Sequence, residues 1–208
     1  MGSLSSKTQQ ISESKRIDDF RLKLAKQIPK FPNDRASLRV LEAKALGPLL
    51  IDYANWAIRY VAPRPRAVVS EDSATSDPLW QSLSSEIEVL LSKVKQGQDL
   101  APHLSLVPHT RGFTPAASAG PPNVDRRADK DMLLNVMGYH HFHFDAVPHN
   151  QMRSDHVVFA HVTRDTFTVA GIFNHTVFEP TAPGQPMMAE RNRLWKIFDE
   201  RSSPTHLI

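Results

Sequence analysis

The side chains best suited to chemistry lie in one short segment, residues 138–145, which holds three histidines within four positions. The segment reads as a strand, in which alternate side chains point to opposite faces. We expect one face to be aromatic and to belong to a core. The opposite face would carry two imidazoles, a phenol and a carboxylate, from Tyr139, His141, His143 and Asp145. Such groups are costly to bury without a use, so we predict the chemical site here.

Metal-independent cleavage of RNA is one chemistry that fits these residues. Attack by the RNA's own 2′-hydroxyl needs a general base, a general acid and a cation over the phosphate, and histidine serves both proton roles near neutral pH. The candidates for these catalytic roles are His141, His143, His175, Arg153 and Tyr139. Arg153 and Arg164 would supply the cation, and Tyr139 a further acid or a stacking surface. The candidates for substrate binding are Arg64, Arg66 and Arg164. This hypothesis needs no cofactor.

A zinc-dependent hydrolase is the alternative. A His-x-His pair with one distant histidine is a ligand set of catalytic zinc sites, which leave one position open for water. Here the set would be His141, His143 and His175. Asp145 or Glu179 would orient an imidazole from outside the ligand set. The chain has no cysteine, so any metal is left to imidazole and carboxylate ligands.

A binding module without catalysis is the second alternative. The polar face of the sheet would then recognise a partner protein or an anion. Metal content and RNA cleavage in a chelator distinguish these three hypotheses.

Composition is that of an ordinary globular protein. The chain has 208 residues, of which 40% are hydrophobic and 23% charged, with a formal net charge of +3. No stretch approaches the roughly 18–20 apolar residues that span a bilayer, so we expect no membrane partner. Residues 1–14 are rich in Ser and Gln and do not resemble a secretory signal. We expect this segment to be disordered and the protein to be cytoplasmic.

The spacing of apolar residues changes along the chain and predicts an α+β fold. Residues 15–100 read as a helical part, interrupted by a proline-rich loop at 62–76. Three end signals stand out: Asn33 or Asp34 as a cap, Asp77-Pro78 as a helix start and Gly97 as a helix end. A second proline-rich loop follows at 101–128.

The spacing of apolar residues then changes to every second position, and residues 129–208 read as a small antiparallel sheet domain that carries the histidine cluster. Strands are expected at 138–145, 155–163 and 166–174, with a tight turn at Arg164-Asp165. A helix at 188–200 closes the chain. We therefore predict an N-terminal helical part, then an antiparallel β-meander, then a C-terminal helix.

The C-terminal part contains, in this order, a strand, an Arg-bearing connection, a hydrophobic hairpin and an Asn-His pair followed by an aromatic residue. The residues concerned are Arg153, 157–173, His175 and Phe178. This order resembles the RelE-type bacterial toxin ribonucleases, whose small sheet carries basic and His or Tyr residues that cut RNA. The resemblance implies RNA as substrate and a cognate inhibitor protein as partner. The Tyr-His-His-Phe-His-Phe stretch with its upstream Arg-Pro-Arg also resembles uncharacterised bacterial proteins, which implies no function.

Overall fold

The computed structural model describes residues 3–30, 32–104, 131–145 and 154–202. The fold is α+β, as predicted, and the chain divides into two compact units. One comprises Met1–Tyr60 with Leu106–Met132, and the other Val61–Ser105 with Leu133–Ile208. The division does not follow the predicted boundary at residue 100, because the helices just before that residue pack on the sheet. Among the described residues, no helix is both long and apolar enough to cross a bilayer.

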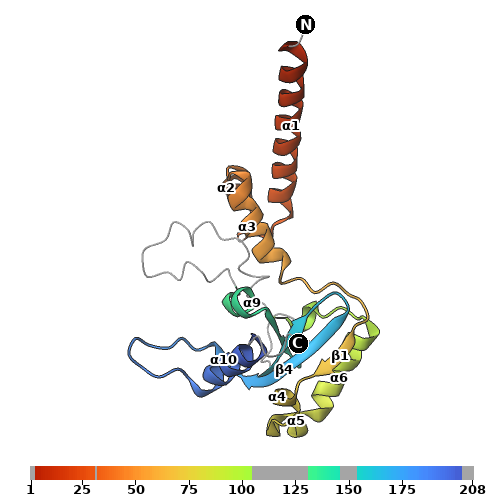
Figure 1. Ribbon diagram of the computed structural model, residues 1–208, viewed down its shortest axis with the longest axis vertical. Helices are drawn as coiled ribbons and strands as arrows, with labels where there is room; N and C mark the ends of the chain where they lie inside the picture. Colours follow the sequence, from red (N-terminus) through yellow and green to blue (C-terminus); the bar gives the residue numbers. More distant parts are fainter. Residues whose placement is uncertain (1–2, 31, 105–130, 146–153, 203–208) are drawn as a thin grey trace. The chain divides into compact units, whose positions relative to one another are not determined.

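The first unit is helical. It contains α1 (Ser3–Gln27), α2 (Arg35–Glu42) and α3 (Leu46–Ala57), with the first part of α1 extending beyond the other two helices in Figure 1. Their small core consists of Leu24, Ala25, Ile28, Leu41 and Leu49. The expectation of disorder over residues 1–14 differs from the structure, in which α1 begins at Ser3. The physical reason is that no proline or glycine interrupts the chain from Ser3 to Gln27.

Asp34 begins α2, as the sequence suggested. Its carboxylate accepts a hydrogen bond of 2.7 Å from the backbone N–H of Ser37. This bond stabilises the charged form and lowers the pKa of Asp34.

The second unit is built on a mixed four-stranded sheet (Figure 1). Its strands are β1 (Ala67–Ser70), β2 (Tyr139–His143), β3 (His156–Val162) and β4 (Thr166–Asn174), in the order β1-β4-β3-β2. The last three are antiparallel neighbours, which confirms the predicted meander.

β1 is the part of the sheet that the sequence did not predict. It pairs parallel with β4, with Ala67 opposite Thr166, inside a segment expected to be a loop. A four-residue edge strand shows too little alternation to be recognised, and its pattern is set by a neighbour far along the chain. The sheet is therefore mixed and not purely antiparallel.

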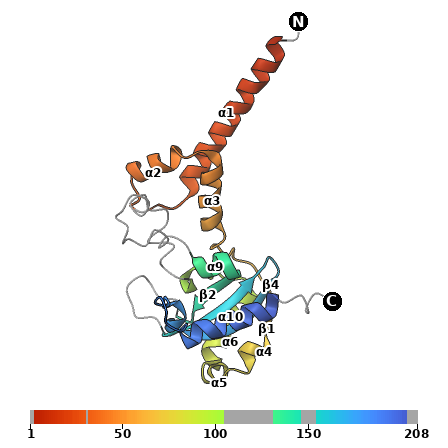
Figure 2. The ribbon, with the colours of Figure 1, turned by 60° about the vertical axis from the view of Figure 1, so that its left-hand side comes forward.

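Helices cover both faces of this sheet (Figures 1 and 2). On one face lie α4 (Asp72–Thr75), α5 (Pro78–Ser82) and α6 (Ser84–Gln96). Asp77 caps α5, and Gly97 ends α6 with a φ of 70°, both as predicted. The core on this side includes Ile87, Leu90, Val94, Phe142, Phe144, Val158 and Ile172.

The other face is covered by α10 (Ala189–Ser202) and by the short 3₁₀ helix η2 (His175–Phe178), which follows β4 directly. The core on this side includes Tyr139, Val157, Phe159, Phe173, Val177, Leu194 and Ile197. The prediction of a C-terminal helix that packs back on the sheet is confirmed.

Two short helices adjoin β2, one directly before it in the chain and one beside it in space. α9 (Met132–Met137) ends at Gly138, whose φ of 74° places it in the left-handed region and whose N–H bonds to the Leu134 carbonyl at 2.9 Å. The 3₁₀ helix η1 (Ala101–His103) is followed by Leu104, which forms an isolated bridge with Phe142. The first residues of the predicted loop at 101–128 therefore form a short 3₁₀ helix and a bridge beside β2.

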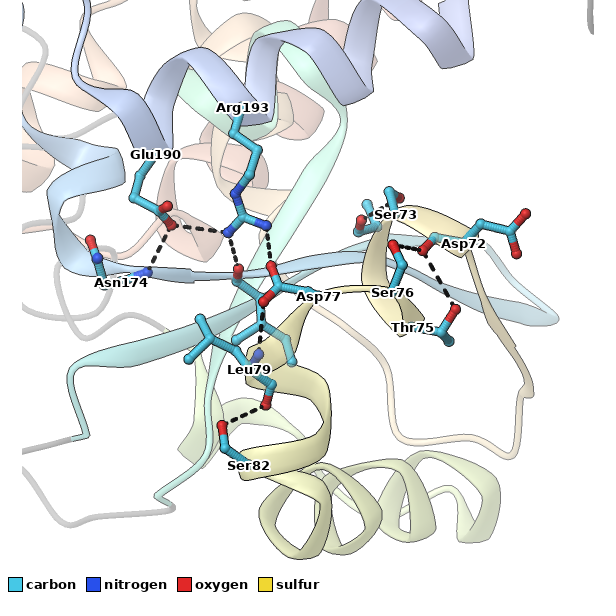
Figure 3. Close-up of polar contacts among 12 residues, drawn as sticks. Asp72, Ser73, Thr75, Ser76, Asp77, Leu79, Ser82, Asn174, Glu190 and Arg193 are labelled. Atoms are coloured by element: carbon cyan, nitrogen blue, oxygen red, sulfur yellow. Dashed lines mark hydrogen bonds and ion pairs between the residues drawn. The ribbon is translucent and has the colours of Figure 1, made fainter.

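Polar side chains complete the edge of β4 where β1 has ended (Figure 3). The Arg193 guanidinium donates to the backbone carbonyl of Ile172 and to the Asp77 carboxylate. Glu190 accepts from Arg193 at 3.0 Å and from the Asn174 N–H at 3.3 Å. Because these bonds satisfy backbone groups of an unpaired strand edge, Arg193 is a structural residue.

Candidate functional site

The three histidines predicted to meet do lie together, at one end of the sheet. His141 and His143 share the α10 face of β2, opposite Phe159 and Val157 of β3, as strand alternation requires. η2 turns back over this face, so that His175 stacks on His143 with ring centres 5.3 Å apart and an interplanar angle of 28°.

The His141 ring fixes the inner side of this cluster. Its centre lies 6.2 Å from that of His143 and 4.8 Å from that of Phe178 in η2. The Phe159 ring lies 5.9 Å away on the sheet. His141 is thus held among aromatic rings, with the His143–His175 pair at the outer end of the strand.

Asp155, which was not singled out from the sequence, orients His175. The ring atom Nδ1 of His175 lies 3.0 Å from the Asp155 backbone oxygen and 3.2 Å from its carboxylate Oδ1. A carbonyl can only accept, so Nδ1 carries a hydrogen and donates. In the neutral ring the lone pair is then on Nε2, to which no described residue hydrogen-bonds. The side chain of His175 is 39% exposed, so this lone pair belongs to a solvent-facing imidazole.

His143 is more deeply placed, with 7% of the residue exposed. Its backbone oxygen lies 2.8 Å from Nδ1 of His103, which is 1% exposed. His103 and Asp155 are the two site residues that sequence reasoning missed. Antiparallel pairing of β3 with β4 could have indicated Asp155, because it places the start of β3, next to Asp155, beside the end of β4, next to His175. No periodic pattern marks His103.

Asp145 lies two residues beyond the end of β2 and is exposed. Its carboxylate accepts a 2.8 Å hydrogen bond from the Ser154 backbone N–H, and so joins the two ends of the connection between β2 and β3. Arg153, the predicted cation, lies outside the described residues. Its role stays a prediction.

Tyr139 occupies a different environment from the one expected. The residue is fully buried in the core under α10, 6.4 Å from the Phe198 ring centre, and the charged neighbour of its hydroxyl is the Arg201 side chain. Burial raises the pKa of the phenol, and the nearby Arg201 opposes that shift. A buried phenol offers neither a stacking surface nor an accessible acid, which corrects the role predicted for Tyr139.

Arg66 has a structural role in place of the predicted substrate-binding one. Only 8% of the residue is exposed. Its guanidinium donates to the backbone carbonyls of Thr163 at 2.9 Å, Ala62 at 3.1 Å and Arg64 at 3.3 Å. Burial, together with the Arg64 charge, lowers the pKa of Arg66. The side chain fastens the start of β1 to the turn between β3 and β4.

The predicted substrate-binding arginines lie at the end of the sheet away from the histidines. Arg164 is in the β3–β4 turn with its side chain 78% exposed, and Arg66 bonds to the same turn. His143 pairs with Val157 at the opposite end of β3. Six residues of strand at about 3.3 Å each separate Val157 from Thr163 by roughly 20 Å. Arg64, Arg66 and Arg164 therefore do not form one site with the histidine cluster.

The zinc ligand set receives no support from the side-chain geometry. No group of three His, Asp or Glu residues within the described ranges is arranged to hold a metal ion. A zinc ion lies close to the plane of each imidazole that binds it, about 2.0–2.1 Å from the nitrogen. The rings of His143 and His175 are stacked and nearly parallel, so their lone pairs do not converge on one point.

No family model, curated protein or solved structure matches this chain. The fold and the site define the class of this protein: it is an α+β protein with a histidine cluster at one end of a sheet that helices cover on both faces. The RelE-type relationship stays a prediction.

Proposed function

We propose that this protein is a metal-independent endoribonuclease of toxin type, with His143 and His175 as its acid–base pair. The observation that carries the proposal is the stacking of these two imidazoles, one of which Asp155 holds with its lone pair on Nε2. A proton donor or acceptor must lie within roughly 2.6–3.2 Å of the atom it serves. Two rings whose centres are 5.3 Å apart can each reach a different oxygen of one phosphodiester.

In this mechanism Nε2 of His175 accepts the proton of the 2′-hydroxyl as that oxygen attacks phosphorus. His143, in its protonated form, gives a proton to the departing 5′-oxygen. The products are a 2′,3′-cyclic phosphate and a free 5′-hydroxyl, so protons and electrons balance without a metal. His141 and Phe178 hold the pair in place by packing.

The remaining parts of the proposal follow from the same hypothesis. RNA is the substrate, Arg153 supplies the cation over the phosphate, and the protein acts in the cytoplasm under the control of a cognate inhibitor protein. The net charge of +3 is compatible with an RNA substrate.

The test is cleavage of end-labelled single-stranded RNA by the full chain in excess EDTA. We expect products with cyclic phosphate ends, and no cleavage of the same sequence as 2′-deoxy RNA. His175→Ala and His143→Ala should each reduce the rate by at least about 100-fold. His156→Ala is the matched control. His156 is the first residue of β3 and precedes Val157, the partner of His143, but strand alternation places its side chain on the face of the sheet opposite to the histidine cluster.

Two results would overturn the proposal. Cleavage that EDTA abolishes and zinc restores would indicate the metal-dependent hydrolase. RNA binding without cleavage, or the absence of both RNA binding and RNA cleavage, would indicate a binding module. The zinc content of the untagged protein, which we expect to be far below one per chain, separates the first result from a contaminating nuclease.

A further inference from the structure

His103 is a buried histidine with both ring nitrogens engaged, next to the proposed acid–base pair. The residue is 1% exposed. Its Nδ1 lies 2.8 Å from the backbone oxygen of His143, and its Nε2 lies 3.0 Å from the ammonium nitrogen of Lys93 in α6. Neither contact is used in the mechanism above.

The two partners determine how the His103 ring is protonated. The His143 carbonyl can only accept, so Nδ1 must carry a hydrogen. The Lys93 ammonium can only donate, so Nε2 must present its lone pair. The contacts together therefore require a neutral ring in the Nδ1–H form. Hydrogen bonds then run in one direction, from Lys93 through His103 to the His143 carbonyl, and the first is charge-assisted.

This chain of bonds acts on β2, the last strand in the order of the sheet, whose strand neighbour among the described residues is β3. On the side of β2 away from β3, Leu104 forms a bridge with Phe142. The next carbonyl along β2 is that of His143, and His103 satisfies it. His143, the last residue of β2, is thereby held by β3 on one side and by His103 on the other.

We propose that His103 is a positioning residue for His143, and that Lys93 acts with it by holding its ring in the Nδ1–H form. The catalytic consequence rests on the proposed ribonuclease function. The hydrogen-bond chain itself does not, because it is defined by contacts of the folded protein. Misplacement of a catalytic group by about 1 Å can cost on the order of 100-fold in rate, so a loss of this chain is expected to appear in kcat.

The first experiment measures the ¹⁵N shifts of the His103 ring in the full chain by NMR. We expect the Nδ1–H tautomer in the wild type, with a coupling across the hydrogen bond from Nδ1 to the His143 carbonyl. In Lys93→Met Nε2 loses its donor, whereas the His143 carbonyl still requires a hydrogen on Nδ1, so we expect the Nε2 shift to change and Nδ1 to keep its hydrogen. A wild-type ring in the Nε2–H form, or doubly protonated, would overturn the hydrogen-bond chain whether or not the protein cleaves RNA.

The second experiment compares two amide replacements of similar volume. In His103→Asn the amide nitrogen takes the place of Nδ1 and can still donate to the His143 carbonyl. In His103→Gln it lies near Nε2 and cannot. We expect kcat of His103→Asn within about threefold of wild type, and that of His103→Gln about 100-fold lower with KM unchanged.

Equal kcat values in the two folded variants would overturn the positioning role. If the wild type does not cleave RNA, the ribonuclease proposal fails, and the NMR result still decides the hydrogen-bond chain. Near-ultraviolet circular dichroism confirms that each variant is folded before rates are compared.

Discussion

Arg193 and Asp77 form an ion pair between helical layers that cover opposite faces of one sheet. Asp77 caps α5, and Arg193 belongs to α10. The pair passes around the edge of β4 beyond the end of β1, where no strand of the described part of the chain pairs with the Ile172 carbonyl. The Arg193 guanidinium also lies 4.0 Å from the Phe173 ring centre. One side chain thus joins two layers and closes an open strand edge.

We expect Arg193→Met to destabilise the protein by about 2 kcal/mol, because it removes a charged donor from two carboxylates, those of Asp77 and Glu190, and from a backbone carbonyl. Arg193→Lys should recover little, since one ammonium cannot reproduce the fork that reaches these acceptors. Urea unfolding measures the change. Lys196→Met on the exposed side of the same helix is the control and should stay within about 0.5 kcal/mol. An equally small effect at Arg193 would contradict the structural role.

A second stability prediction concerns Arg66. Arg66→Met should lower the free energy of unfolding by about 2 kcal/mol, because three backbone carbonyls lose a charged donor. Arg164→Met, at an exposed position in the adjoining turn, should change it by less than about 0.5 kcal/mol. Thermal unfolding of both variants checks this. If Arg66→Met were neutral in stability and weakened RNA binding, the substrate-binding role would return.

Tyr139→Phe tests whether the phenol takes part in chemistry. The Tyr139 hydroxyl is buried beside Arg201, which keeps its ion pair with Glu71 when the hydroxyl is removed, so Tyr139→Phe should change the free energy of unfolding by no more than about 1 kcal/mol. RNA cleavage should be unchanged. A large fall in kcat with an unaltered unfolding midpoint would show that the buried hydroxyl has a catalytic role after all.

His161 makes a pH-dependent contribution to stability. Burial, and then the charge of Arg201, lower the pKa of His161 below the usual histidine value of about 6.5. The unfolded chain therefore binds a proton more readily than the folded one, and stability falls as the pH drops from about 6.5 towards the lower folded value. We expect His161→Gln to lose less stability than the wild type between pH 7 and 5, as measured by urea unfolding in matched buffers. Parallel curves for the two proteins would contradict the assignment.

Local pattern predicted the parts of the fold that depend on near neighbours. The alternation of Tyr139, His141 and His143 placed them correctly on one face, and Asp34, Pro78 and Gly97 marked helix ends because caps act within one turn. These features need only residues that are close in sequence or joined by a short turn. The meeting of His175 with His143 has another origin, because β3 lies between β2 and β4 and it is η2 that brings His175 back over the face of the sheet.

What the sequence could not provide were relationships that depend on distant pairing. Arg66 looked like a free cation because nothing near it in sequence indicates that the carbonyl of Thr163 would be its acceptor. Ala67–Ser70 is a strand only because β4 lies beside it. Tyr139 appeared accessible because the strand pattern does not show that α10 covers that end of the face.

The parallel pairing of β1 with β4 has a consequence for how the protein folds. β3 and β4 form a local hairpin, whereas β1 must find its place from far upstream in the chain, and such distant contacts form slowly. We expect the hairpin to form early and β1 to dock late, together with the helices that follow it. In pulse-labelled hydrogen exchange during refolding, the amides shared by β3 and β4 would become protected before that of Ala67, which bonds to Asp165. The late step would be the one that brings Lys93 and His103 to the edge of β2, so the histidine pair would acquire its final geometry only at the end of folding.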